Sequence, residues 1–379
     1  MTRTHQTGHA GTSVRHYVAG GTEHGGGIGR LVGYICTSGS QASHRVTDTR
    51  GPRWNRLVSP LKLAQAMSAM AVDRITAPTR VHHIHIAGRG STARKLILGA
   101  LARRLGCIHI VHLHDYDYAD DFTRRPDWQK RAIRKLFNGA DRVIVLGGRD
   151  RDTAINQLDT QRPKVSVLHN AVPDPGVART RTRPASDPVR LVFLGQLGPR
   201  KGVPELLRAL AHPTMTGLPW QAVLAGDGPV DAYREEADAL GLSARVTLPG
   251  WLTAPQVQTL CRGSDVLVLP SHGEGMAMAV LEGMAHGLAV VTTPVGAHTE
   301  VLTDGVTGVF VPVGDVTALA ETLARLVMHD TERNDLSNGA RAQYLSAFSI
   351  AAYAVKLDAL YRSTAKEARA SRAVRAGAA

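Results

Sequence analysis

Two carboxylates eight positions apart, Glu274 and Glu282, flank the predicted start of a helix. Gly273 and Gly275 let the preceding loop approach a ligand closely, and the free backbone N–H groups of the first helical turn, expected from Met276, favour anions. A carboxylate beside bound phosphate is electrostatically costly, so each glutamate is better suited to accept hydrogen bonds from the neutral hydroxyls of a sugar or a ribose. The pattern therefore indicates a sugar nucleotide.

The segments on either side of this helix support a ligand site. Residues 265–270 and 288–293 are apolar runs that predict buried strands before the loop and after the helix. A strand, a glycine loop, a helix and a second strand form a parallel βαβ unit, whose ligand sites lie at the carboxyl ends of the strands. The alternative is an ordinary solvated helix, because two glutamates at this spacing also occur by chance.

Further motifs around this unit resemble a known family, the retaining nucleotide-sugar glycosyltransferases of the GT-B fold that carry a Glu-x7-Glu signature (group 1, family 4-like). The resemblance covers most of residues 189–315, with the motifs in the family's order. Besides the signature, the stretches that carry it are residues 191–195, 200–202 followed by 205–207, 224–229, 246–250, 294–297 with Glu300, and 304–308. Each motif alone is weak, whereas together they are specific.

The resemblance implies an α/β architecture in which two Rossmann-like domains face each other across a cleft that holds the donor. By this analogy Lys201, together with Arg200, neutralises the phosphates of a nucleotide diphosphate sugar. The backbone amides after Gly275, those of Met276 and Ala277, would bind the same phosphates.

Other positions receive roles from the same resemblance. Glu282 would hold the ribose hydroxyls of the donor, and Glu274 its sugar hydroxyls. His114, at the end of a predicted strand, matches the family's cleft histidine, which contacts the donor sugar. Backbone near Gly250 would select the base, and the glycine loop that contains Gly27 would face the cleft.

The resemblance also implies a retaining, metal-independent transfer without a cofactor, since the nucleotide sugar is itself a substrate. The acceptor would attack from the face that the diphosphate leaves, and a phosphate oxygen would help to remove its proton. Fixed cations and dipoles stabilise the leaving charge, so no covalent nucleophile is needed. One departure stands out, because Gln196 occupies a position where the family commonly has arginine. Either Arg200 compensates for the missing charge or phosphate binding is weaker.

Length and composition fit two domains, since 379 residues suffice for two full cores. We expect an N-terminal acceptor-side domain over residues 1–185 and a C-terminal domain that binds the nucleotide sugar over residues 186–346. Residues 173–188, rich in Pro, Arg and Thr and without apolar periodicity, predict the connector. Residues 347–379 predict a helix that, by resemblance, crosses back to the first domain, and a frayed basic tail from Lys366.

The cysteines, the apolar runs and the charge indicate the compartment of the chain and its possible partners. Three widely spaced cysteines predict no disulfide framework, hence a reducing cytosol. No run is long and apolar enough for a membrane span or, in residues 2–12, for a secretory signal.

The net charge of the chain is +13, and basic residues are most concentrated in residues 128–137. There Trp128, Ala132, Ile133 and Leu136 form one helical face opposite Lys and Arg. This predicts a surface helix, or contact with an anionic membrane at its inner face. Nucleic acid is not an expected partner, because no binding motif is found and aromatics make up only 4%.

Two glycine-rich helix starts lie in the first domain. Residues 25–30 follow a predicted strand at 14–19, and their amides could face a phosphate or the acceptor, although Arg30 breaks the dinucleotide fingerprint. Residues 88–91 with Arg94 and Lys95 suit an anion such as a phosphorylated acceptor, with Ser91 as a cap. The alternatives are a flexible turn and a well-capped helix.

Two strands each carry a His-x-His pair, in residues 81–86 and 108–115. Paired imidazoles with a nearby carboxylate can bind zinc, so a metal-dependent hydrolase is the rival hypothesis. Most strand histidines are not ligands, however, and the carboxylate after His114 lies at the wrong spacing, so we predict no metal. His85 is a further candidate near the acceptor side. The Asp115-Tyr116-Asp117 triplet recurs in form at residues 150–152, so it carries little weight.

The sequence thus predicts a hexosyltransferase whose acceptor is a glycan, a lipid-linked glycan or a small molecule. A role in bacterial cell-surface polysaccharide or glycolipid synthesis follows from the resemblance and the basic surface. The alternatives are a phosphorylase or a sugar-nucleotide epimerase on the same fold, the zinc hydrolase, and a binding module without turnover.

Overall fold

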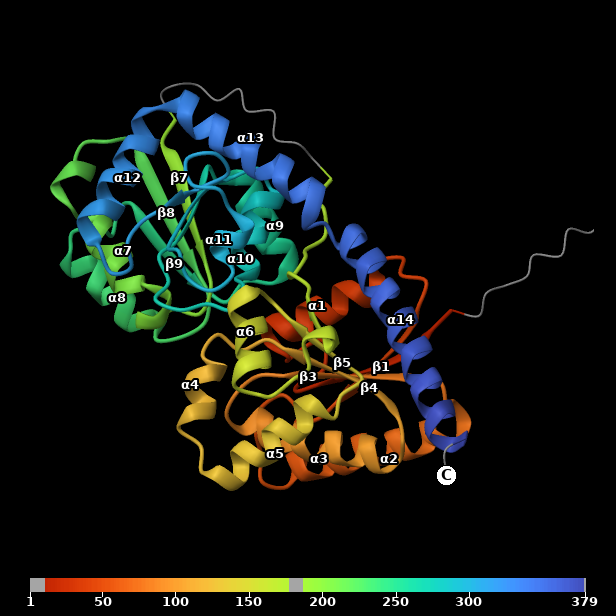
Figure 1. Cartoon of the computed structure of the whole chain (residues 1–379). Coiled ribbons are helices and arrows are strands. Elements are labelled where there is room, and N and C mark those ends of the chain that lie inside the picture. The colour runs from red at the N-terminus through yellow and green to blue at the C-terminus, as the bar shows by residue number, and fades with distance from the viewer. Residues whose placement is uncertain (1–10, 177–186, 378–379) are drawn as a thin grey trace, which may run out of the picture. The chain divides into compact units, whose positions relative to one another are not determined.

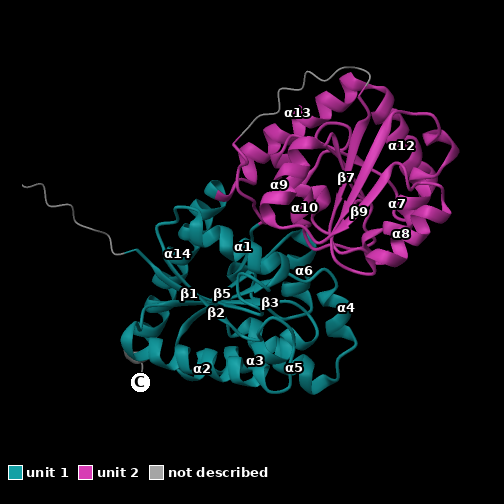
Figure 2. Cartoon of the chain, turned by 180° about the vertical axis from the view of Figure 1, so that it is seen from behind, with its two compact units in different colours: residues 1–168, 351–379 teal, residues 169–350 magenta. Residues whose placement is uncertain are grey.

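A computed structural model describes residues 11–176 and 187–377 of the protein. The chain forms two compact units (Figure 2): unit 1 comprises residues 1–168 and 351–379, and unit 2 comprises residues 169–350. Residues 185 and 186, where we expected the domain boundary, lie outside the described residues, and so does most of the expected connector. Residues 2–10, part of the polar start, also lie outside them.

Unit 1 is a parallel six-stranded sheet with helices on both faces (Figure 1). The strands lie in the order β2-β1-β3-β4-β5-β6. They are β1 (Ser13–Val18), β2 (Ser43–Asp48), β3 (Val81–Ile86), β4 (Ile108–Leu113), β5 (Arg142–Val145) and β6 (Val165–Val167). The helices are α1 (Gly26–Thr37), α2 (Val58–Thr76), α3 (Gly90–Arg104), α4 (Tyr118–Thr123), α5 (Asp127–Asn138), α6 (Gly148–Asn156), the 3₁₀ turn η1 (Arg162–Lys164) and α14 (Ile350–Gly377).

Unit 2 repeats this plan with the strand order β12-β11-β10-β7-β8-β9, so the two predicted Rossmann-like α/β layers are confirmed. Its strands are β7 (Val189–Leu194), β8 (Trp220–Ala225), β9 (Val246–Gly250), β10 (Val266–Leu269), β11 (Ala289–Thr292) and β12 (Val309–Phe310). Its helices are η2 (Pro199–Lys201), α7 (Val203–Leu210), η3 (Pro213–Met215), α8 (Val230–Ala239), α9 (Ala254–Gly263), α10 (Met278–Ala285), α11 (His298–Val301), α12 (Val316–Met328) and α13 (Asp330–Ala347).

The central strands of unit 1 are buried along their whole length, as parallel strands between helical layers must be. Successive side chains alternate between the two faces of the sheet. Ile84 and Ile86 pack with α2, α3 and α5 in two apolar clusters. The alternate positions, His83 and His85, therefore point to the opposite face, where α14 contributes Tyr361.

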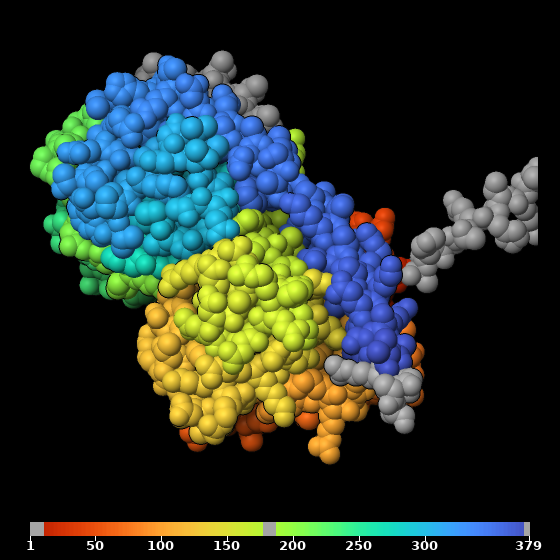
Figure 3. All heavy atoms as spheres, viewed as in Figure 1, coloured from red at the N-terminus to blue at the C-terminus, as the bar shows by residue number. Residues whose placement is uncertain are grey.

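The C-terminal helix α14 is one continuous element that belongs to unit 1 from residue 351 onward, and it lies along the surface of that unit (Figure 3). The expectation of a frayed tail from Lys366 is wrong as far as Gly377. Glu367 pairs with Arg142 at 2.7 Å, and Arg372 lies 3.4 Å from Asp141, so residues 367 and 372 are held against β5 and the residue before it.

The predicted basic helix is α5, and its apolar face buries Ile133, Leu136 and Phe137 in the unit 1 core. Trp128, which we expected on that face, is instead 62% exposed and lies in the first turn of the helix, before the buried residues. The burial favours an ordinary surface helix. Among the helices described, none combines the length and apolarity that crossing a bilayer requires.

Two neighbouring strand ends in unit 2 approach so closely that only glycine fits. A Cβ on Gly226 would lie 1.7 Å from the carbonyl oxygen of Gly195, whereas one on Gly198 would meet nothing within 4 Å. Gly226→Ala is therefore expected to lower the free energy of unfolding by roughly 1–3 kcal/mol, as overpacking does, and Gly198→Ala to leave it nearly unchanged. Urea unfolding of both variants tests this, and equal stabilities would contradict it.

Candidate functional site

The order of the strands in unit 2 creates a point where the connections reverse direction. From β7 the chain runs through β8 and β9 on one side, and through β10, β11 and β12 on the other. The loops after β7 and β10 therefore diverge at the carboxyl edge of the sheet, which is where α/β proteins bind ligands. Lys201 follows β7, and Glu274 follows β10.

Two features of the backbone bring these loops together. Gly202, with φ of 71°, lies against the β10 loop so closely that a Cβ would stand 2.0 Å from the carbonyl oxygen of Pro270. The His272 N–H donates to the carbonyl of Arg200 at 2.8 Å. Lys201 is thereby carried to Glu274, and its Nζ donates to Glu274 Oε1 at 2.5 Å.

Glu274 is almost fully buried and has three cationic or hydroxyl neighbours. Its Oε1 accepts from Lys201 and from Ser271 Oγ, the latter at 2.7 Å, and lies 3.7 Å from Arg200 Nη1. Arg200 also donates to the carbonyl of Gly273 at 2.8 Å. The sequence predicted both cations and the carboxylate. It did not predict that they contact one another, nor the hydroxyl of Ser271.

The helix after this loop begins two residues later than we expected. Ala277, in an extended conformation, is the N-cap, so α10 starts at Met278. Met276 instead packs below the loop, where its sulfur accepts from the Asn170 N–H and its carbonyl from Asn170 Nδ2. The unsatisfied amides of a helix start are therefore those from Met278 onward, and the placement of the first turn at Met276 is corrected.

The remaining predicted residues of unit 2 lie along the same edge. Glu282 is buried in α10, one turn after its start. Gly250 ends β9 with φ of 77°, and its carbonyl accepts from the Gly226 N–H at 2.9 Å. Gln196, in the arginine position of the family pattern, is exposed just after β7. Their predicted contacts with ribose, base and phosphate stay predictions.

One buried histidine beside this loop was missed from the sequence. His298, at the start of α11, bonds through Nδ1 to the Thr293 carbonyl at 3.1 Å, and within the described parts of the chain its buried Nε2 has no partner. Burial lowers its pKa, although the nearby Glu274 carboxylate opposes that shift. A neutral imidazole thus lies near Glu274.

Unit 1 has its own reversal of strand order, between β1 and β3, and a cavity of about 420 Å³ opens there. The loops after both strands line it, as the position at a switch point predicts. Two arginines, Arg50 and Arg94, enter the cavity, and His85 lies in its wall. Arg94 Nε is buried and has no partner among the residues described.

Both predicted glycine-rich helix starts of unit 1 belong to this region. Gly25 and Gly90 line the cavity, and Gly27 is exposed in the first turn of α1. Lys95, expected to bind an anion here, points inward instead, where its fully buried Nζ donates to the Tyr17 carbonyl and to Thr49. Burial lowers the pKa of Lys95 well below its usual value, so it offers no cation to a ligand.

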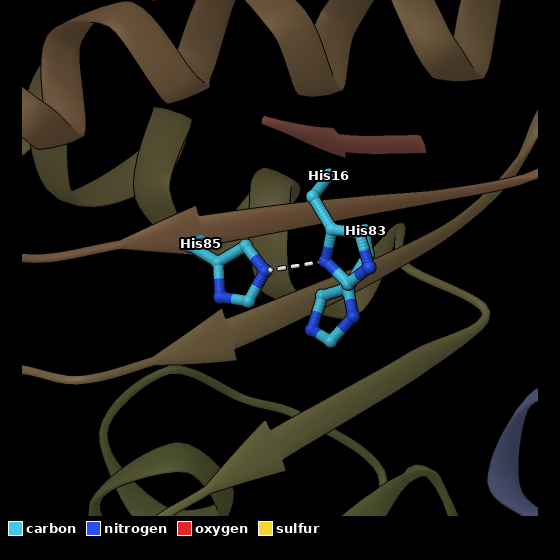
Figure 4. Close-up of side chains that lie close together, drawn as sticks. All are labelled: His16, His83 and His85. Carbon is cyan, nitrogen blue, oxygen red and sulfur yellow. Dashed lines mark hydrogen bonds between the residues drawn. The ribbon is translucent and has the colours of Figure 1, made fainter. Parts of the chain in front are cut away.

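Histidines from three adjacent strands gather on the sheet face next to α14. His16 of β1 lies beside His83 and His85 of β3 (Figure 4), and these meet His112 and His114 at β4. The parallel register places them side by side. Burial lowers the pKa of His16 and of His114 to about 3, so both imidazoles are neutral at ordinary pH.

This gathering is the only arrangement in the described residues that brings three potential metal ligands together. The groups are His16 with His83 and His85, and His85 with His112 and His114, each with nitrogens within 4.8 Å of one another. Both nitrogens of His16, His83 and His85 already bond to protein groups, however. The donor set contains no carboxylate, since Asp115 turns to Gly88, where burial raises the pKa of its carboxyl to about 6. Hydrogen bonding therefore accounts for this cluster without a metal.

Two Rossmann-like units in one chain, each with polar loops at its switch point, define the architecture of GT-B glycosyltransferases. Anabaena Alr3699/HepE, solved in complex with UDP and glucose, has the same fold, with a TM-score of 0.72 over 93% of this chain and 100% of that chain at 17% identity.

Family models identify the chain more closely. The model for glycosyl transferases group 1 matches residues 178–343, and that for the glycosyl transferase 4-like domain matches residues 10–171. The two matches together take in most of the sequence, and the chain belongs to these glycosyltransferases.

Curated relatives agree with this assignment. The chain is 28% identical to the alpha-D-kanosaminyltransferase of Streptomyces kanamyceticus, over 74% of this chain and 76% of that protein. It is 30% identical to the D-inositol 3-phosphate glycosyltransferase of Mycolicibacterium smegmatis, over 63% of this chain and 56% of that protein. The match thus spans little more than half of the latter relative.

Acid is expected to destabilise the fold through the neutral buried histidines. In the unfolded chain these groups bind protons below their usual pKa of 6.5, whereas folded His16 and His82 stay neutral down to about 3 and 4. The unfolded state then binds more protons, so each such histidine lowers the free energy of unfolding by up to about 1.4 kcal/mol per pH unit as the pH falls from 6.5. Asp115, with its raised pKa, acts in the opposite direction but is a single group.

Urea unfolding at several pH values between about 7.5 and about 5 measures this dependence. Equal free energies of unfolding across that range would contradict the burial of neutral imidazoles.

Proposed function

We propose that the protein transfers a hexose from a nucleotide diphosphate sugar to a hydroxyl of an acceptor, with retention of configuration. The bond from the anomeric carbon to the diphosphate breaks, and the leaving phosphate takes the electron pair. The acceptor oxygen bonds to the same face of that carbon, and its proton passes to a phosphate oxygen. The convergence of Lys201, Arg200 and Glu274 at the switch point of unit 2 is the observation that carries the proposal.

The charges at this point suit the proposed leaving group. Lys201 and Arg200 are fixed cations, and the dipole of α10 adds positive potential at its start. Such preorganised groups stabilise developing negative charge without a divalent cation. Glu274 Oε1 is held by Lys201 and Ser271, which orients the carboxylate so that it can accept hydrogen bonds from sugar hydroxyls.

For the acceptor we propose a small phosphorylated or otherwise anionic polyol that enters the cavity of unit 1. Arg50 is braced there by the carbonyls of His24 and Pro52, and Arg94 offers a buried N–H. Two guanidinium groups favour a phosphate, which accepts paired hydrogen bonds. The name of the mycolicibacterial relative, which includes inositol 3-phosphate, is consistent with this choice. Membrane contact and a cell-surface role stay predictions.

The donor and the reaction type can be tested together. A thermal-shift screen of uridine, guanosine and adenosine diphosphate sugars should reveal one class that raises the melting temperature, because a ligand at 100 times its Kd stabilises by about 2.7 kcal/mol. Product analysis with the donor alone, with and without inorganic phosphate, then separates a transferase from a phosphorylase or an epimerase. Loss of activity in chelator, with recovery on adding zinc, would instead favour the hydrolase.

Lys201→Ala is expected to lower turnover about 10²–10³-fold, as removal of one preorganised donor does, and to lower the melting temperature while the protein still folds, because Glu274 loses its ion-pair partner. Lys201→Arg keeps the charge and serves as the matched control, which should retain more activity than the alanine variant. Steady-state kinetics with the donor from the screen measures both. Near-normal turnover of Lys201→Ala would remove the phosphate role.

Arg94→Gln is expected to raise the KM for the acceptor about 10- to 100-fold while changing the KM for the donor little, because a charge-assisted hydrogen bond to the acceptor is lost. Arg104→Gln, at the exposed far end of the same helix, is the control and should behave like the parent protein. If the parent protein and Arg94→Gln both use a neutral acceptor equally well, the proposal of an anionic acceptor is contradicted.

A further inference from the structure

Four histidines of unit 1 are joined end to end by hydrogen bonds between their rings. His44 Nδ1 lies 3.0 Å from His16 Nε2, His16 Nδ1 lies 3.0 Å from His85 Nε2, and His85 Nδ1 lies 2.9 Å from His114 Nε2. Figure 4 shows the middle link, between His16 and His85. We name these four residues the imidazole row; it ends at His114, directly after β4.

Hydrogen counting couples the four rings. A neutral imidazole has one nitrogen that donates and one that accepts. Burial lowers the pKa of each ring in the imidazole row, so all four are neutral. Because every link needs one donor and one acceptor, the rings must all be oriented alike. Either each carries its proton on Nε2, or each carries it on Nδ1.

A carboxylate of α14 decides between these two states. His44 Nε2 lies 2.9 Å from Ser40 Oγ, and Ser40 Oγ lies 2.6 Å from Asp358 Oδ1, the short length typical of a hydroxyl that donates to a carboxylate. The Gln41 N–H donates to Asp358 Oδ2 at 2.8 Å, so both carboxylate oxygens accept hydrogen bonds. An ionised carboxylate only accepts, so the Ser40 proton points to Asp358. His44 Nε2 must then donate to Ser40.

The same orientation continues along the row to its far end. If His44 carries its proton on Nε2, so do His16, His85 and His114. We propose that Asp358, through Ser40 and the imidazole row, fixes His114 in the tautomer that has its proton on Nε2 and a lone pair on Nδ1. In the described part of the chain, Nδ1 of His114 has no hydrogen-bond partner.

That lone pair gives His114 a definite preference, which rests on the proposed function. Nδ1 accepts a hydrogen bond from a hydroxyl of the donor sugar and repels a group that can only accept. The residues behind His114 touch no substrate in this scheme, so Asp358, Ser40, His44, His16 and His85 are positioning residues.

A second branch of histidines lies beside the row without sharing its hydrogen bonds. His83 bonds through Nδ1 to the Tyr361 hydroxyl at 2.7 Å and through Nε2 to His112 Nδ1 at 3.1 Å. Tyr361 lies on α14, one turn after Asp358. Tyr361→Phe therefore changes one oxygen atom on the same helix and serves as the matched control.

Asp358→Asn should reverse the row while keeping its shape. The Gln41 N–H can only donate, so it takes the amide oxygen of the new side chain, and the amide NH₂ must face Ser40. The Ser40 proton then turns to His44 Nε2, the oxygen still accepting from the Ala42 N–H, which lies 3.1 Å away. Each ring of the row follows, and His114 gains its proton on Nδ1.

Nitrogen-15 NMR of the full-length protein, with labelled histidine and His114 assigned by comparison with a His114→Asn spectrum, reports the tautomer directly. We expect the Nε2 proton in the parent protein and in Tyr361→Phe, and the Nδ1 proton in Asp358→Asn. Should Asp358→Asn fail to fold, Ser40→Ala replaces it and should yield a mixture of both tautomers. A proton on Nδ1 in the parent protein, an unchanged tautomer in the folded variants, or one tightly bound zinc per chain that shifts the His16 and His85 signals would overturn the proposal.

Kinetics with monodeoxyfluoro analogues of the donor sugar tests the preference separately. Fluorine cannot donate, so the analogue at the contacted position should lose about tenfold in kcat/KM relative to the parent sugar, as one unmade hydrogen bond implies. This discrimination should shrink in Asp358→Asn and persist in Tyr361→Phe. If the tautomers are as predicted but the analogues show no discrimination, the imidazole row stands, and the contact between His114 and the donor sugar that the family resemblance implies is refuted.

Discussion

The candidate donor site of unit 2 depends on the close approach of two loops at the carboxyl edge of its sheet. Gly202 makes that approach possible, since any side chain there would collide with the Pro270 carbonyl. Once the loops meet, Lys201 and Glu274 neutralise each other in a nearly dry place, where either charge alone would be costly. Backbone geometry thus comes first, and the pairing of charges follows from it.

Unit 1 meets a different constraint, because its sheet buries polar rings where a parallel sheet normally buries aliphatic side chains. A buried polar group without a partner is costly, and most of these imidazoles find one in another imidazole. The solution uses neighbouring strands in register, so that rings on adjacent strands lie within hydrogen-bond distance. A mutual arrangement of this kind also restricts which nitrogen of each ring is free to meet a ligand.

Much of the fold could be predicted from local sequence patterns, because strands and glycine loops are each formed by consecutive residues. The runs at 81–86, 265–270 and 288–293 were recognised as strands and lie within one residue of β3, β10 and β11 at each end. Lys201 and Glu274 were recognised by motif. Their mutual contact was not, because it depends on how closely two separate loops approach. The start of α10 was misplaced because the side chain and carbonyl of Met276 serve a partner a hundred residues earlier.

Other contacts could not be predicted from the sequence either, because their partners lie far apart along the chain. Ser40 and Asp358 are 318 positions apart, and no periodicity links them. Lys95 follows a helix start that suits anions, but tertiary packing determines whether its amine faces solvent or the Tyr17 carbonyl. Short-range patterns thus identified elements and candidate chemistry, whereas partners depended on register and packing.

The contribution of α14 to unit 1 has a consequence for biosynthesis. Unit 2 is one uninterrupted stretch, residues 169–350, so all of it is synthesised before residues 351–377 of α14. Unit 1 is discontinuous: its six strands are synthesised first but lack Asp358, Tyr361 and Glu367 until unit 2 has been synthesised. Unit 2 can therefore begin to fold while unit 1 still lacks α14, the reverse of the usual vectorial order in which N-terminal domains fold first.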